Sequence, residues 1–229
     1  MDIEARPPQT TQQYVLEQLR RAILTGQLAP GSAIRQDALA EQLGVSRVPI
    51  REALKILEGE GQVIYRPRRG YMVAELALED FLEVYRIRQI LEEEAVRRAI
   101  ERITDEDIQR LQDAHADVVA AGQAGEIIAM AAANRRFHFT LIDAAGMPRL
   151  RRFLSILWDA SDVYRSLYYS EESNRERVER EHQGIIDAVR ARDTEDLIRR
   201  LGEHRAGTVA TFREFMAKQD NPAAVRRTP

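Results

Sequence analysis

The chain of 229 residues contains no cysteine, which excludes disulfides and thiolate metal ligands and leaves histidine or oxygen donors for any metal site. No apolar run approaches the roughly 20 residues that a membrane-spanning helix needs. The amino-terminal segment "MDIEARPPQT" also lacks the basic and apolar regions of a secretion signal. With 44% hydrophobic and 31% charged residues, the composition is that of a globular protein, which we expect to be cytoplasmic and without a membrane partner.

Lysine is nearly absent as well, since only two of the 34 basic residues are lysines. Arginine is therefore the ordinary cation of this protein, and a single arginine is weak evidence of function. The net charge of −3 excludes a generally basic protein. Residues 47–69 nevertheless hold six basic and three acidic residues, so any surface that binds a polyanion is local.

Residues 8–75 have the pattern of a winged helix-turn-helix domain. A helix is expected after Pro8, with its apolar residues at helical spacing, and a second over residues 36–43. Gly44 then allows a bend, and Ser46 is a suitable N-cap for a third helix that ends near Gly59 or Gly61. The stretch "QVIYRPRRGYMVAEL" predicts two short strands joined by a basic turn with Gly70 at its tip.

The third helix separates its residues into two faces. Ile50, Ala53, Leu54 and Leu57 predict a buried stripe, whereas Arg47, Arg51 and Lys55 recur at i, i+4 and i+8 on the other side. A solvated surface helix is the simpler interpretation of such a face. The helix-turn-helix frame and the basic turn with Arg68 and Arg69 favour DNA contact instead.

The segments "RQDALAEQLGVSRVPIREALKILEGEG" and "RPRRGYMV" closely resemble the DNA-binding domain of the GntR family of bacterial transcription regulators. The resemblance implies DNA contacts for Arg35, Ser46, Arg47 and Arg51. It assigns Arg47 and Arg51 to bases, Arg35 to phosphate, and Gly70 to the wing tip. We expect a homodimer on a palindromic double-stranded DNA operator, because one recognition helix reads too few base pairs to discriminate well.

Residues 78–219 predict an antiparallel α-helical bundle, followed by a flexible tail over residues 220–229. Gly122, Gly125 and Gly146 are expected to separate neighbouring helices, and Thr104 with Asp107 to begin one. The six expected helices cover residues 78–101, 105–121, 126–144, 148–171, 173–192 and 195–218. The fold class is therefore mainly α.

Three of the four histidines lie on apolar faces of three different expected helices. They are His138, with Asn134 one turn earlier, His182 and His204. The simpler alternative is that each is a core histidine bonded to a neighbour. Burying three imidazoles without a partner or a cation is costly, however, so convergence on a metal is the sharper hypothesis. His115 is expected to be structural.

Residues 79–216 resemble the FCD effector-binding domain of FadR-type GntR regulators, through "YRIRQILEEEAVRRA", "NRRFHFTLIDAAGMPRL", "EHQGIIDAV" and "EHR". Six helices would favour the VanR-like subgroup. The resemblance implies that Asn134, His138, His182 and His204 hold a divalent transition metal, for which Zn, Ni and Mn are the candidates. Asn134 stands where aspartate is the commoner ligand. We expect Arg88 to anchor a small organic acid, with a surface ion pair to Glu92 as the alternative.

These patterns predict a transcription regulator, expected to be a repressor, whose dimer responds to a small carboxylic acid bound at a metal site. One alternative is a metal-dependent enzyme that uses the three histidines. No inward aspartate or glutamate stands out as its general base, and we therefore expect no enzymatic activity. The other alternative is a regulator that senses the metal itself without an organic effector.

Overall fold

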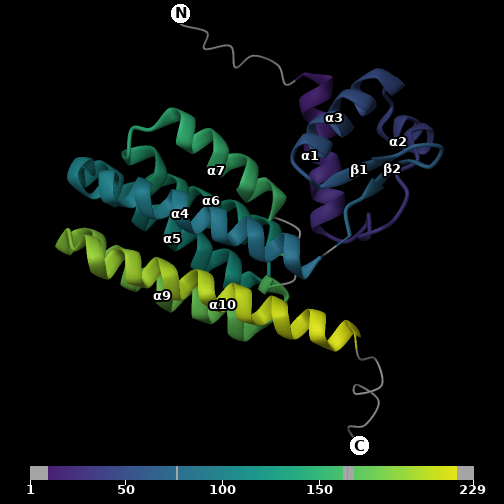
Figure 1. Cartoon of the computed structure of the whole chain (residues 1–229). Coiled ribbons are helices and arrows are strands. Elements are labelled where there is room, and N and C mark those ends of the chain that lie inside the picture. Colours follow the sequence, from purple (N-terminus) through teal and green to yellow (C-terminus); the bar gives the residue numbers. More distant parts are fainter. Residues whose placement is uncertain (1–9, 76, 162–163, 165–167, 221–229) are drawn as a thin grey trace, which may run out of the picture. The chain divides into compact units, whose positions relative to one another are not determined.

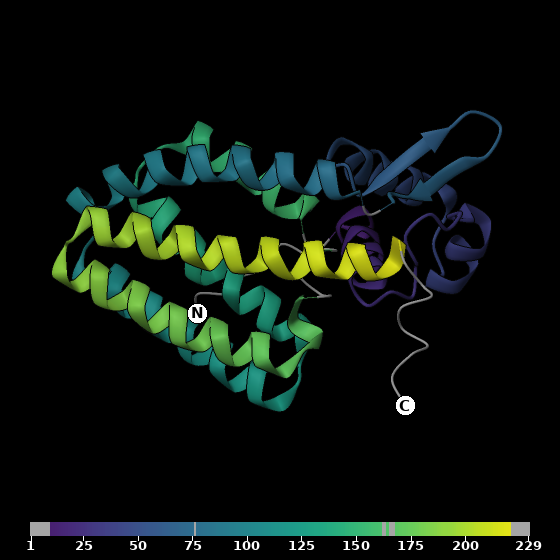
Figure 2. The same cartoon turned by 60° about the horizontal axis from the view of Figure 1, so that its bottom comes forward.

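The computed structural model describes residues 10–75, 77–161, 164 and 168–220 of the chain. The chain divides into two compact units, Met1–Glu75 and Leu76–Pro229, each described here by itself. Both are built mainly from α-helices, which confirms the predicted fold class, and the coloured ribbon can be followed through each unit in Figures 1 and 2. None of the described helices has the length and apolarity to cross a membrane.

The first unit has the predicted order of three helices and a hairpin. Its elements are α1 (Thr11–Leu24), α2 (Gln36–Leu43), α3 (Arg47–Gly59), β1 (Val63–Arg66) and β2 (Gly70–Val73). Thr10 begins α1 with a reciprocal capping box to Gln13. Gly44 ends α2 in the left-handed region, at φ 65°, and so gives the chain the sharp bend between the two helices.

The core of the first unit lies between α1 and α3. Val15 and Leu19 of α1 are at most 1% exposed, and they belong to a helix that packs directly against α3. The predicted stripe on α3 is confirmed, since Ile50, Ala53, Leu54 and Leu57 are all 0% exposed. The face of α3 opposite this buried stripe therefore lies outside the core.

The hairpin differs in one detail from the expectation. Gly70 is not the tip of the turn but the first residue of β2, where it pairs with Arg66 in an antiparallel register. The tip is made by residues 67–69, closed by a hydrogen bond from the Arg69 amide to the Arg66 carbonyl. Gly70 has φ 79°, which explains why glycine suits the return into the strand.

The second unit is a helical bundle. Its named helices are α4 (Leu78–Arg102), α5 (Asp105–Ala124), α6 (Ile127–Ala144), α7 (Pro148–Ala160), α9 (Glu172–Ala191) and α10 (Thr194–Asp220). Thr104 and Asp107 form the predicted capping box at the start of α5. Gly122 does not separate two helices as expected, because α5 continues through it and ends at Gly125 in the left-handed region.

The single helix expected over residues 148–171 is wrong. Helix α7 ends at Ala160, and the described residues 168–170 are helical again before α9 begins. A tertiary contact lies at the end of α7. The fully buried Ser161 hydroxyl donates a hydrogen bond to the Trp158 carbonyl and accepts one from Arg88. Without that helix, the count of six no longer supports the VanR-like subgroup. The tail beyond residue 220 lies outside the described residues.

Candidate DNA interface and candidate ligand site

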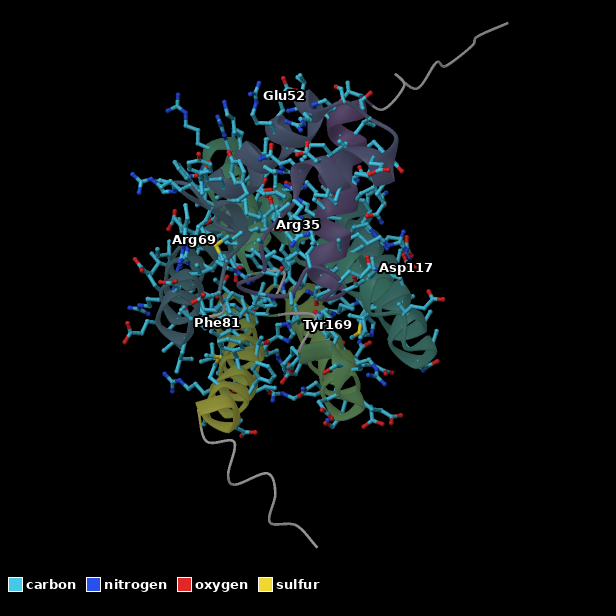
Figure 3. The ribbon with its side chains drawn as sticks, turned by 90° about the vertical axis from the view of Figure 1, so that its right-hand side faces the viewer. Arg35, Glu52, Arg69, Phe81, Asp117 and Tyr169 are labelled. Atoms are coloured by element: carbon cyan, nitrogen blue, oxygen red, sulfur yellow. The ribbon has the colours of Figure 1, made fainter. Side chains whose placement is uncertain are left out.

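The exposed face of α3 carries the side chains predicted to contact DNA. Arg47, Arg51 and Lys55 are all exposed, on the side of the helix away from its buried stripe. Arg35 is exposed as well and stands at the N-cap of α2. The side chains of the first unit, Arg35 among them, project from the ribbon in Figure 3.

Two details of the amino end of α3 were not expected. Ser46 is the N-cap residue, but within the described part of the chain its side chain makes no capping hydrogen bond. Val48 was missed by the sequence reasoning and is 53% exposed in the first turn of α3. An exposed apolar group there suits contact with a thymine methyl group.

Arg47 is not a free cation in this structure, because it forms an ion pair with Asp37 of α2. The two side chains are 72% and 68% exposed, so solvent screens the pair and it contributes little to stability. The pair ties α2 to α3 and can be exchanged for an anion at small cost.

The hairpin turn adds a second basic group. Arg68 and Arg69 are both exposed at the tip, with Arg68 in the left-handed region at φ 66°. Tyr65 is 54% exposed on β1 and contacts Tyr71 edge to face, with the ring centroids 5.2 Å apart. Arg69 is labelled in Figure 3. The first unit thus presents cations on both its third helix and its wing.

In the bundle, the three inward histidines converge as predicted. His138 comes from α6, His182 from α9 and His204 from α10, and one ligand nitrogen of each lies within 4.8 Å of the others. Their exposures are 6%, 0% and 7%. Asn134 is 2% exposed and lies one turn before His138 on α6, with both side chains lining the same internal cavity. The structure therefore brings all four predicted metal ligands together.

The chemistry of this cluster fits a transition metal. Among the described residues, neither ring nitrogen of His182 has a hydrogen-bond partner, and the same holds for the Oδ1 atom of Asn134. Burial lowers the pKa of His182 well below its usual value, and the nearby His204 and His115 lower it further. A neutral imidazole is the form that binds a metal, so His182 is in the correct state to do so.

Glu181 orients one of the histidines from outside the cluster. Its Oε2 atom lies 2.7 Å from Nδ1 of His204, which leaves Nε2 as the nitrogen available to a metal. Burial alone would raise the pKa of Glu181, but hydrogen bonds and charges from His204 and Arg177 outweigh burial and lower it. An ionised carboxylate behind a histidine strengthens that histidine as a ligand.

Arg88 lies in the same cavity and is buried, not on the surface. Its guanidinium pairs with Glu92, with Nη2 3.0 Å from Oε1, and donates from Nη1 to Ser161 at 3.1 Å. It also stacks on the Trp158 ring, with 4.0 Å from Cζ to the ring centroid. The alternative of an ion pair with Glu92 therefore named the correct partner. The pair is not on the surface, however, since both side chains are at most 6% exposed.

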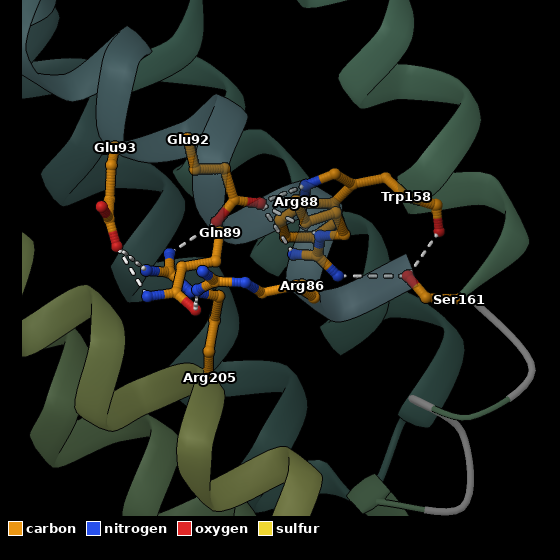
Figure 4. A network of polar contacts seen from close by, with 8 residues as sticks. All are labelled: Arg86, Arg88, Gln89, Glu92, Glu93, Trp158, Ser161 and Arg205. Carbon is orange, nitrogen blue, oxygen red and sulfur yellow. Dashed lines mark hydrogen bonds and ion pairs between the residues drawn. The ribbon is translucent and has the colours of Figure 1, made fainter. Parts of the chain in front are cut away.

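Glu92 is at the centre of this buried network, shown in Figure 4. Besides Arg88, it accepts hydrogen bonds from Trp158 Nε1 at 3.0 Å and from Arg205 Nη1 at 2.7 Å. Burial alone would raise the pKa of Glu92, but the two guanidinium groups and the indole lower it. Glu92 is thus an inward carboxylate that the sequence did not single out, but its two ion pairs and lowered pKa do not suit a general base.

The cavity joins the histidine cluster to the arginine network. Its free space is about 20 Å³, room for one water-sized species. Its lining residues are Tyr85, Arg88, Glu92, Asn134, His138, Trp158, Tyr168, Tyr169, Val178, Leu201, His204, Arg205 and Thr208. A small polar ligand in this place would meet metal ligands on one side and guanidinium groups on the other.

Several of these residues were missed because the signal for them was weak or ambiguous. Glu181 and Arg205 each stand next to a predicted histidine in sequence, at "EREH" and "EHR", and that adjacency is the only hint. Trp158 is the one tryptophan of the chain and was given no role. His115, expected to be structural, has its ring 5.9 Å from that of His182.

A basic helix-turn-helix face and a polar cavity inside a helical bundle define a DNA-binding regulator with a ligand-binding domain. Comparison with known proteins agrees. Residues 11–73 match the model for bacterial regulatory proteins of the gntR family, and residues 83–207 match the FCD domain. The chain belongs to the GntR family of transcription regulators and carries an FCD effector-binding domain.

Relatives support the assignment over most of the chain. The HTH-type regulator YdhC of Bacillus subtilis (strain 168) is 31% identical over 182 residues, which cover 78% of this chain and 80% of YdhC. The HTH-type regulator McbR of Escherichia coli (strain K12) is also 31% identical, over 77% and 81% of the two chains. The solved structure of E. coli McbR superposes with a TM-score of 0.79, at 26% identity, and covers 90% of this chain and 99% of its own. The protein is a regulator and not an enzyme, as expected.

Proposed function

We propose that this protein is a cytoplasmic, homodimeric repressor that binds a palindromic operator and is controlled by a small carboxylic acid at a metal site in the bundle. The observation that carries the proposal is a buried cavity lined by His138, His204, Asn134 and two arginines, with His182 completing the histidine cluster beside it. Residues 8–75 are the DNA-binding domain and residues 78–219 the effector-binding and dimerisation domain.

On DNA, α3 enters the major groove with Arg47 and Arg51 toward base edges. Arg35, Ser46 and Lys55 contact the backbone, and the wing adds Arg68, Arg69 and the Gly70 amide. Support comes from the exposure of every one of these side chains and from the free face of α3. Bidentate arginine contacts to guanine supply specificity, and contacts to phosphate supply affinity that depends on salt.

Dimerisation through the bundle has support in an exposed apolar surface. Ile87 and Ile90 on α4 are 38% and 54% exposed, and Phe153 and Ile156 on α7 are 61% and 38% exposed. The two helices pack against each other. Large exposed apolar side chains on neighbouring helices are typical of a surface that a second copy covers.

Asn134, His138, His182 and His204 would hold a divalent cation, with Zn, Ni and Mn as candidates, and a bound cation would attract an anionic ligand. Imidazole and amide ligands bring no negative charge to the ion, and the Glu181 carboxylate behind His204 is already paired with Arg177. Arg88 lines the same cavity and provides a second anchor for a carboxylate. Differential binding of the acid to two states of the bundle would shift the population that is competent for DNA.

The experiment that tests this uses the full-length protein purified without chelator and without a nickel column. Elemental analysis is expected to find about one equivalent of a transition metal, and His182→Ala to lose it, whereas His115→Ala keeps it. Operator duplexes selected from a random pool should be released by at least one of acetate, lactate, succinate or citrate. A metal-free protein whose stability does not respond to added Zn contradicts the metal site. Release by Zn alone, with no response to any acid, favours the metal-sensing alternative.

A further inference from the structure

Glu92 is held in the way a bound carboxylate would be held. Its Oε1 atom accepts from Arg88 and from the Trp158 indole, and its Oε2 atom accepts from Arg205. The three donors come from three different helices, α4, α7 and α10. Figure 4 shows them around the carboxylate. Charged donors that converge on both oxygens of a buried carboxylate form a built anion site.

Only one of the two carboxylates in this network is fully buried. Two buried guanidinium groups share one buried carboxylate, and Glu93 approaches Arg205 only to 3.8 Å with its own side chain 32% exposed. Glu181 is engaged elsewhere, because Arg177 and His204 already bind it. Nη2 of Arg205 is buried and, among the described residues, has no hydrogen-bond partner, so this end of the cavity keeps a donor for a further carboxylate.

Trp158 connects the anion site to the histidine cluster. Its ring centroid lies 4.0 Å from Cζ of Arg88 and 5.0 Å from the centroid of the His138 ring. Both ends line one cavity, in which only about 20 Å³ is free. An organic acid therefore needs space, and the side chain of Glu92 occupies the arginine end.

We propose that Glu92 is an internal competitor of the effector, and that the effector is a short dicarboxylate. One carboxylate of this ligand reaches the histidine cluster, and the other replaces Glu92 between Arg88 and Arg205. The proposal rests on the proposed function and deepens it by naming the ligand class and the residue that sets its affinity. Displacing Glu92 supplies both the space and the donors, since the arginine pair exchanges one carboxylate for another.

The test is calorimetric titration of succinate and acetate into the Zn-loaded full-length protein and its Glu92→Gln variant. In this proposal succinate binds only those molecules in which Glu92 is displaced. Removing the Glu92 carboxylate makes every molecule competent, so the apparent affinity rises by a factor of one over the competent fraction. We expect the Kd of succinate to fall about tenfold or more, with that of acetate changing less than about threefold. The double variant Glu92→Gln/Arg205→Gln should lose the gain for succinate.

Glu93→Gln is the matched control, because Glu93 lies on the same helix and carries the same charge but touches Arg205 only at 3.8 Å. It should leave the Kd of succinate within about threefold of the unmodified protein. Since Glu92→Gln leaves two buried arginines unmatched, Glu92→Asp provides a second variant with the charge on a shorter side chain. We expect it to bind succinate more tightly than the unmodified protein and less tightly than Glu92→Gln.

The single tryptophan supplies an independent signal, since Trp158 donates to Glu92. Succinate should change Trp158 fluorescence in the unmodified protein and change it less in Glu92→Gln, where the bond to a carboxylate is already absent. Succinate binding that is equal or weaker in both Glu92 variants overturns this inference and leaves the proposed function standing. Failure of the unmodified protein and of both variants to bind any of the four acids overturns the two together.

Discussion

The two units of the chain use arginine in opposite surroundings. In the first unit Arg35, Arg51 and the arginines of the wing are exposed, and Arg47 has a partner that is 68% exposed itself. In the bundle Arg88 and Arg205 are 3% and 7% exposed, and they share a buried carboxylate. A guanidinium in solvent is screened and exchanges partners at little cost, whereas a buried one requires a matched anion. Exposed arginines therefore suit reading a polyanion, and buried ones suit holding one small ligand.

The largest expected effect is on the free energy of unfolding when a buried arginine is removed. Arg205→Ala leaves the Glu92 carboxylate with one fewer charged donor inside the bundle. We expect the unfolding free energy to fall by about 3–5 kcal/mol in urea titrations. Arg51→Ala, its exposed counterpart, should stay within about 0.5 kcal/mol. Similar losses in the two variants would show that burial does not separate the two sets of arginines.

The next largest effect is on DNA binding, where two exposed cations of α3 are expected to contribute in different ways. Arg51→Ala should lose about 1–3 kcal/mol of discrimination at one base pair, because a bidentate contact to guanine disappears. Lys55→Ala should weaken binding to all duplexes and reduce the salt slope by about 1. Fluorescence anisotropy with operator and random duplexes at several salt concentrations measures both. Equal loss on the two duplexes for Arg51→Ala would contradict its assignment to bases.

A smaller effect is expected when the charge of the metal site is changed. Asn134→Asp replaces one of the four donors with a carboxylate, so it should tighten Zn binding by about tenfold and weaken binding of the carboxylic acid. The reason is that the new side chain supplies negative charge that the ligand otherwise brings. Competition with a chelator measures the first change and calorimetry the second. Undiminished binding of the acid would show that charge balance does not recruit it.

The smallest effect is on the dependence of stability on pH. The pKa of Glu92 is lowered in the folded protein, although burial acts against this, because Arg88 and Arg205 favour its charged form. Its contribution to stability is complete above its unfolded pKa of about 4.5 and is lost as the pH falls through the lower folded pKa. Unfolding free energies below pH 5 should therefore fall less steeply in Glu92→Gln than in the unmodified protein. Glu93→Gln, by comparison, should keep the slope.

Local chemistry accounts for the parts of the structure that were predicted well. The winged helix-turn-helix follows from periodicity, from the cap at Thr10 and from the bend at Gly44, all of which act within a few residues of the chain. The inward faces of the helices that carry His138, His182 and His204 could likewise be assigned one helix at a time. Their convergence to within 4.8 Å is consistent with three inward faces of one bundle.

Contacts between distant segments decided the rest. Trp158 and Arg205 lie 66 and 113 residues from Glu92, so no spacing in the sequence indicates that they bind it. No glycine or proline marks the end of α7 in the sequence. The helix ends at a buried serine that accepts a hydrogen bond from Arg88 of α4. Periodicity places a side chain on the inner face of its helix, but only the packing of α4 against α7 and α10 determines which inner faces meet. The role of Arg88 can therefore be assigned only from the tertiary structure, because it depends on whether the guanidinium contacts solvent or a buried carboxylate.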